Sequence, residues 1–122
     1  MTPSTLLVVE DERAVRDLLV AVLRREGFTV YAAASAEEAV ELELPRAADC
    51  LVTDVMLPGM NGPELARTLR GRWPAVRVIF MSGYAGALLT EEEMAGAEFI
   101  QKPFDARVVA RKVRSVLNPA AD

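Results

Sequence analysis

The chain has 122 residues, of which 14 are basic and 18 acidic, so its net charge is -4, and 52% of its residues are hydrophobic. This length suits one domain with its own core, and the composition is that of an ordinary soluble globular chain. The acidic balance argues against nucleic-acid binding, which needs a concentrated basic face, and we expect no membrane partner, because the longest apolar runs are strand-sized. The single cysteine, Cys50, and the lack of histidine exclude an internal disulfide, a Cys/His zinc site and imidazole catalysis.

The first half of the chain alternates apolar runs with amphipathic stretches. A buried strand is predicted at 6–9, and the helix that follows, 13–26, has an apolar stripe from which Val20 is absent. The stripe consists of Val15, Leu18, Leu19, Val22 and Leu23. A second strand is predicted at 28–32, and Ser35 with Glu38 predicts a capped helix that ends near Leu44, before Pro45.

The second half repeats the alternation. Strands are predicted at 50–53, 76–81 and 98–101. Helices are predicted at 63–70, where Pro63 suits a first turn, at 90–94, where Thr90 and Glu93 form a capping box, and at 105–117, which Asp105 caps. Five strand-then-helix repeats predict a doubly wound α/β fold, a parallel sheet with helices on both faces. We expect one domain over 1–118 with a tail at 119–122, and a cytoplasmic location, because no export signal opens the chain.

Charged and polar residues follow four of the predicted strands. Glu10 and Asp11 follow the first, and Asp54, Ser82 and Lys102 follow the third, fourth and fifth. In a doubly wound sheet these positions meet at the carboxyl edge, where sites form. Carboxylates held about 4 Å apart repel by roughly 4 kcal/mol per pair at an effective dielectric constant of about 20. Lys102 or a hard cation, with Mg²⁺ favoured, must therefore compensate them.

This set of groups suits phosphoryl transfer to a carboxylate. Asp54 stands alone at its strand end, which favours it as the nucleophile, while the adjacent Glu10 and Asp11 favour metal binding. Ser82 can donate a hydrogen bond to a bound phosphoryl oxygen. Capping of the first helix by the acidic pair is compatible with metal binding, because both need acids at a helix start.

Four motifs lie in order at the ends of the predicted strands. They are Val-Val-Glu-Asp-Glu12, Val-Thr-Asp-Val-Met-Leu-Pro-Gly-Met-Asn-Gly62, Phe-Met-Ser-Gly-Tyr84 and Gly-Ala-Glu-Phe-Ile-Gln-Lys-Pro-Phe104. Together they resemble the receiver domain of two-component response regulators, in particular receivers attached to hybrid histidine kinases. The resemblance covers about Thr5 to Leu117 and implies a flavodoxin-like (βα)5 fold with strand order 2-1-3-4-5.

The resemblance implies a phosphorelay role for the acidic residues. Asp54 would accept a phosphoryl group from a phosphohistidine on a histidine kinase or a histidine phosphotransfer domain. Asp11 and Asp54 would ligate Mg²⁺ through their side chains, and Met56 through its backbone carbonyl. Glu10 stands where the family often has aspartate, and this longer acid would reach the metal through water.

The resemblance also assigns the remaining positions. Ser82 and Lys102 would assist catalysis, and the Lys102–Pro103 peptide bond would be cis. Phe99 would turn inward after phosphorylation and alter the surface around the fourth helix and fifth strand, a possible face for a homodimer or an output domain; a static packing role for Phe99 is the alternative. The unusual segment 85–96 places standard dimerisation through that face in doubt.

Two other functions stay open at this point. One is a Mg²⁺-dependent phosphohydrolase that works through an aspartyl-phosphate, although Met56 stands where such an enzyme needs a second acid. The other is a receiver-like interaction module that is never phosphorylated, although such a module has no need to hold repelling charges together. The leading hypothesis is a signalling switch that catalyses its own modification and has no separate substrate turnover.

Overall fold

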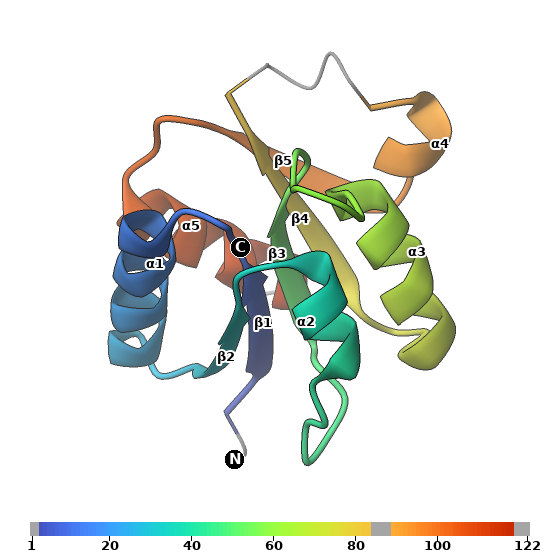
Figure 1. Ribbon diagram of the computed structural model, residues 1–122. Coiled ribbons are helices and arrows are strands. Elements are labelled where there is room, and N and C mark those ends of the chain that lie inside the picture. Colours follow the sequence, from blue (N-terminus) through green and yellow to red (C-terminus); the bar gives the residue numbers. More distant parts are fainter. Residues whose placement is uncertain (1–2, 84–88, 119–122) are drawn as a thin grey trace.

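The computed structural model of the chain describes residues 3–83 and 89–118. In this part of the chain, five strands form one parallel sheet in the order β2-β1-β3-β4-β5 (Figure 1). The strands are β1 (Thr5–Val9), β2 (Thr29–Ala33), β3 (Cys50–Asp54), β4 (Arg77–Ser82) and β5 (Ala97–Gln101). This arrangement confirms the doubly wound fold and the strand order that the sequence predicted.

Helices cover both faces of the sheet. Figure 1 shows α1 and α5 on one face and α2 and α3 on the other, with α4 near β5 at the edge of the sheet. The helices are α1 (Arg13–Arg25), α2 (Ala36–Glu41), α3 (Gly62–Arg72), α4 (Glu91–Met94) and α5 (Ala106–Leu117). In the described part of the chain, each helix is too short or too polar to cross a membrane.

The strands divide their side chains between two hydrophobic cores. Because successive strand residues point to opposite faces, Leu6 and Val8 pack with α1 and α5, while Leu7 and Val9 pack with α2 and α3. Both pairs are fully buried, as the continuous apolar run at β1 requires. Cys50 lies in the first core, where burial raises the pKa of its thiol to about 12, so it acts as an inert packing residue.

The apolar stripe predicted for α1 was wrong at one position. Leu19 and Leu23 are fully buried, but the side chain of Leu18 is 51% exposed. Val20, which the stripe left out, packs against the core instead. The buried face of α1 is therefore rotated toward Val20 relative to the predicted stripe. Leu18 lies at the edge of the groove between α1 and the loop after β5.

Several helix ends differ from the prediction. The Ser35 hydroxyl accepts a hydrogen bond from the Glu38 N–H as expected, but α2 ends at Glu41 rather than near Leu44. The α3 helix begins at Gly62, one residue before the predicted start, because Asn61 and Glu64 form a reciprocal capping box. The predicted tail 119–122 lies outside the described residues.

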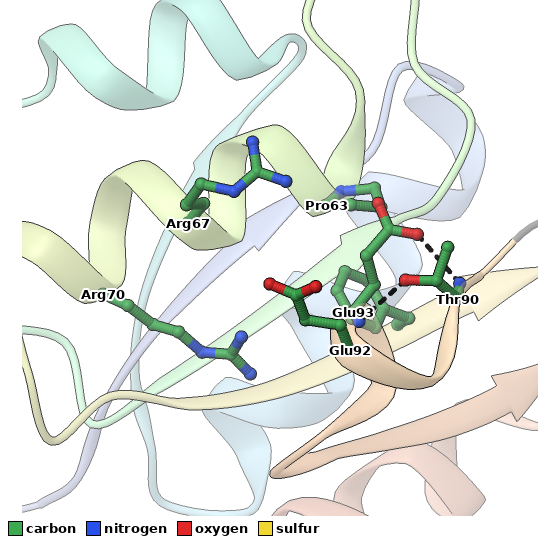
Figure 2. Close-up of a pocket in the computed structure, with 7 residues that line it drawn as sticks. Pro63, Arg67, Arg70, Thr90, Glu92 and Glu93 are labelled. Atoms are coloured by element: carbon green, nitrogen blue, oxygen red, sulfur yellow. Dashed lines mark hydrogen bonds between the residues drawn. The ribbon is translucent and has the colours of Figure 1, made fainter.

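The short fourth helix is confirmed. Thr90 and Glu93 exchange hydrogen bonds as a capping box, which fixes the single turn of α4. Figure 2 shows this turn across a cavity from Arg67 and Arg70 of α3, and the cavity has a volume of about 440 Å³. None of the α4 residues is fully buried, and only the partly buried Met94 packs against the core, so local capping adds to a small packing contact in holding this helix.

Candidate functional site

The carboxyl ends of four strands converge on one small cavity of about 200 Å³. It brings together the six residues for which the sequence predicted catalytic or metal-binding roles: Glu10, Asp11, Asp54, Met56, Ser82 and Lys102. Phe99, the predicted switch residue, does not line this cavity. It lies on β5 opposite Phe80 and is partly buried against the core under α2 and α3.

Lys102 bridges two carboxylates. Its ammonium nitrogen lies 2.6 Å from Oε1 of Glu10 and 2.8 Å from Oδ1 of Asp54. The Glu10 side chain is completely buried and that of Asp54 is 6% exposed, whereas a quarter of the lysine side chain reaches solvent. Charge-assisted hydrogen bonds of this kind are the strongest available to a buried acid. Lys102 therefore supplies the positive charge that the converging acids require.

Both side-chain oxygens of Glu10 are engaged. Oε1 accepts from Lys102, and Oε2 accepts from the backbone N–H of Glu12 at 3.0 Å. The Glu10 backbone carbonyl also accepts from the Arg16 guanidinium at 2.9 Å. The sequence predicted no role for Glu12 or Arg16, and neither residue type carries a signal for such a contact. These bonds fix the β1–α1 turn and hold Glu10 toward the lysine.

The acids at this edge fit a hard divalent cation. One carboxylate oxygen from each of Glu10, Asp11 and Asp54 lies within 4.8 Å of the others. Oxygen donors and retained waters are what Mg²⁺ prefers. Asp11 is exposed and therefore accessible from solvent, while the oxygens of Glu10 are already hydrogen-bonded. The donor set thus suits a metal held mainly by Asp11 and Asp54.

The ionisation of the three central groups is shifted by their contact. Burial, together with the neighbouring Glu10 carboxylate, raises the pKa of Asp54 to about 7 against the opposing effect of Lys102. Burial alone would raise the pKa of Glu10, but hydrogen bonding to Asp54, Lys102 and the Glu12 N–H lowers it overall. Burial opposes the charge on Lys102, yet its two carboxylate partners raise its pKa above 10.5. The three groups therefore titrate together.

The loop after Asp54 depends on a glycine at its end. A side chain at Gly62 would place its Cβ 2.1 Å from the Asp54 backbone carbonyl oxygen. The Gly62 N–H instead donates to the Val55 carbonyl at 3.0 Å, which closes the base of the loop. This close approach positions α3 under the site and explains why the predicted loop signature ends in glycine.

The ends of β4 and β5 are joined across the site. The Lys102 N–H donates to the Ser82 carbonyl at 2.8 Å, and the Ser82 side chain is buried. The Lys102–Pro103 peptide bond is cis, as the resemblance predicted. Met56 lines the cavity with a side chain that is 57% exposed, whereas Tyr84 of the third motif lies outside the described residues.

The fold and this site define a signalling switch that accepts a phosphoryl group. The family model of the response regulator receiver domain matches residues 6–114, so the chain belongs to the receiver domain family. The sensor kinase CckA of Brucella abortus is 42% identical over 118 residues, which are 93% of this chain and 12% of that protein. The transcriptional regulatory protein FixJ of Azorhizobium caulinodans is 35% identical over 94% of this chain and 56% of its own length.

Solved structures give the same result. The crystal structure of the receiver domain from the hybrid histidine kinase CckA has a TM-score of 0.78 at 36% identity, with 93% of this chain and 99% of that chain covered. The FixJ-N crystal structure has a TM-score of 0.81 at 32% identity and covers 97% of this chain and 96% of that chain. The predicted likeness to hybrid-kinase receivers is thereby confirmed, although the chain spans only part of the full CckA and FixJ proteins.

Proposed function

We propose that Asp54 is the phosphoacceptor and receives its phosphoryl group from a phosphohistidine on a histidine kinase or a histidine phosphotransfer domain. The observation that carries this proposal is the Lys102 ammonium, 2.8 Å from Asp54 Oδ1 in the cavity at the strand ends. A new phosphoryl group adds roughly -1.5 to -2 charges, and Lys102 is placed to offset them. Ser82, at the end of the neighbouring strand, is the donor to a phosphoryl oxygen.

The proposed cofactor is Mg²⁺. Asp11 and Asp54 would hold it by side chain and Met56 by its backbone carbonyl, while Glu10, engaged with Lys102, would act through water. When bound, the cation neutralises charge on the transferring phosphoryl oxygens. Lys102 and the metal thus share the compensation of the acids at this edge.

The partner's phosphohistidine needs a surface beside the cavity, and the groove along α1 is suited to it. Two adjoining hollows, of about 420 and 710 Å³, share Leu18 and Phe104, and the smaller one also reaches Lys102. We define this surface as the Leu18 groove. Its apolar part consists mainly of Val15, Leu18, Val22, Pro103 and Phe104, and charged residues line the rest: Glu12, Arg25, Glu26, Lys102, Asp105 and Arg107. A helical segment of the partner with an apolar stripe would bury Leu18 and bring its histidine to Asp54.

The proposed output is a change around α4 and β5. Phe99 and Met94 of α4 pack against the core but are only partly buried, so both can rearrange at a lower cost than fully buried side chains. We propose that Phe99 moves inward when Ser82 engages the phosphoryl group, and that the face from α4 to α5 then contacts a second copy or an output domain. Phe99 has no hydroxyl, so packing alone would drive this movement.

The wider setting is proposed as follows. Residues 1–118 form a single receiver domain with a tail at 119–122, located in the cytoplasm and acting in a two-component phosphorelay. The domain catalyses its own phosphorylation and dephosphorylation, and no separate substrate is turned over.

One experiment tests the central assignment. With Mg²⁺ and acetyl phosphate, intact mass should rise by one phosphoryl group, roughly 80 Da. Asp54→Asn should abolish the rise, whereas Asp17→Asn, a change at an exposed acid of α1, should leave it intact. Continuous phosphate release from a metabolite would favour a phosphohydrolase instead. A native chain left unmodified by both acetyl phosphate and a cognate kinase would favour a module that is never phosphorylated.

A further inference from the structure

A glutamate outside the strand-end cavity holds the loop that follows Asp54. Glu37 lies in the first turn of α2, and its Oε2 accepts a hydrogen bond from the backbone N–H of Met60 at 2.8 Å. Gly59, the preceding residue, has a φ of +75°, and a Cβ there would lie 2.5 Å from the same Glu37 oxygen. The loop therefore approaches the carboxylate so closely that a side chain at position 59 would displace it.

This contact fixes one of two anchor points of the loop. At the base, the Gly62 N–H donates to the Val55 carbonyl, and at the tip the Met60 N–H donates to Glu37. Met56 lies between these anchors on the cavity side. A loop held at both ends has fewer conformations to lose when a ligand orders it, and such preorganisation increases affinity.

We propose that Glu37 is a positioning residue that holds the loop 55–60 in the conformation in which the Met56 carbonyl can bind Mg²⁺. The inference rests on the proposed function, because Met56 is a ligand only there. The Glu37 carboxylate is ionised at neutral pH, and the direction of its pKa shift, lowered by the hydrogen bond from Met60, agrees with this contact favouring the charged acceptor. Glu37 acts through the loop and touches neither the metal nor the phosphoryl group.

The test compares three variants of the whole chain. Glu37→Ala removes the acceptor, Glu37→Gln keeps an acceptor oxygen without the charge, and Glu38→Ala removes an equal charge from an exposed position in the same turn. Amide hydrogen exchange at Met60 without metal, and the Mg²⁺ dissociation constant by calorimetry, are measured for each. We expect Glu37→Ala to speed Met60 exchange and weaken Mg²⁺ binding about three- to tenfold, since Glu37 is exposed and its hydrogen bond should contribute no more than an ordinary one.

The controls separate positioning from general effects. Glu37→Gln should recover most of both properties, and Glu38→Ala should match the native chain. With acetyl phosphate, Glu37→Ala should need more Mg²⁺ but reach the native rate at saturation, because the reacting groups are unchanged. The inference would be overturned if Glu37→Gln lost as much Mg²⁺ affinity as Glu37→Ala, or if Glu38→Ala lost as much. Either result would show that only the negative charge matters. Native Mg²⁺ affinity in Glu37→Ala would overturn it as well, whereas a native chain that binds no Mg²⁺ would instead refute the proposed metal site.

Discussion

Lys102 forms a 2.6 Å ion pair with Glu10, a carboxylate whose side chain is completely buried. Glu10 follows β1 and Lys102 follows β5, so the pair links two strand ends that are far apart in the sequence. Because the same ammonium also contacts Asp54, one lysine stabilises the fold and compensates the proposed phosphoacceptor. Its removal should affect stability before any chemistry is considered.

The first prediction concerns Lys102→Ala. Removal of one partner from a buried pair leaves an uncompensated charge, which typically costs about 3–5 kcal/mol. Because a quarter of the Lys102 side chain is exposed, we expect the free energy of unfolding without metal to fall by about 2–3 kcal/mol. Urea unfolding at pH 8 in chelator measures it, and Mg²⁺ should restore part of the loss. Adding Glu10→Gln to Lys102→Ala should recover at least half of the lost free energy of unfolding. If the effects of the two single substitutions simply add in the double variant, the pairing is contradicted.

The second prediction is that Asp54→Asn stabilises the metal-free chain. The pKa of Asp54 is raised by burial and by Glu10 from 3.8 to about 7. Between these pH values the folded chain keeps a proton on Asp54 that the unfolded chain releases. The contribution of this proton to the free energy of unfolding is therefore fully present below about pH 4 and is lost as the pH rises through about 7. The amide carries no charge to repel Glu10. We expect a gain of about 1–3 kcal/mol at pH 8.

The measurement for Asp54→Asn is urea unfolding at pH 5 and pH 8 in chelator. The gain over the native chain should shrink at pH 5, where the native Asp54 is mostly protonated. A gain of equal size at both values would mean that the carboxylate charge is not its cause. Asp17→Asn, at an exposed acid, should change stability by less than about 0.5 kcal/mol at either pH.

The sequence located the site more accurately than it located the surface around it. Strand ends are marked by short apolar runs, so the sequence pattern alone placed Glu10, Asp54 and Lys102 at one edge of the sheet. The sequence specifies the rotation of α1 about its axis less sharply, because this helix has aliphatic residues on adjacent faces. Whether Leu18 or Val20 faces the core depends on packing against α5 and the sheet. The contact between Glu37 and Met60 joins two segments that no local pattern relates, so only the tertiary structure shows it.

The third prediction contrasts two glycines of α3. In Gly62→Ala the new Cβ would lie 2.1 Å from the Asp54 carbonyl oxygen, a backbone atom that cannot move without shifting the site. We expect a loss of more than about 3 kcal/mol, or failure to fold. Gly71 lies in the same helix, and a Cβ there would have no neighbouring atom within 4 Å. Gly71→Ala should therefore raise the free energy of unfolding by about 0.5–1 kcal/mol. Thermal unfolding of both variants provides the test, and similar transitions for the two would show that the close approach at Gly62 is not required.

The last prediction tests the Leu18 groove as the partner surface. Leu18 is half exposed, so Leu18→Ala should change the free energy of unfolding by less than about 1 kcal/mol. If Leu18 is one of the few residues that anchor the centre of the partner interface, transfer from the kinase should slow about tenfold, because truncation of such an anchor costs more than about 1 kcal/mol of binding. Phosphorylation by acetyl phosphate should stay at the native rate, since this small donor needs no protein surface. Val108→Ala, at an exposed aliphatic of α5, is the matched control and should leave both rates unchanged. Equal slowing with both donors would place the effect of Leu18 inside the site, and no slowing with either would move the docking surface elsewhere.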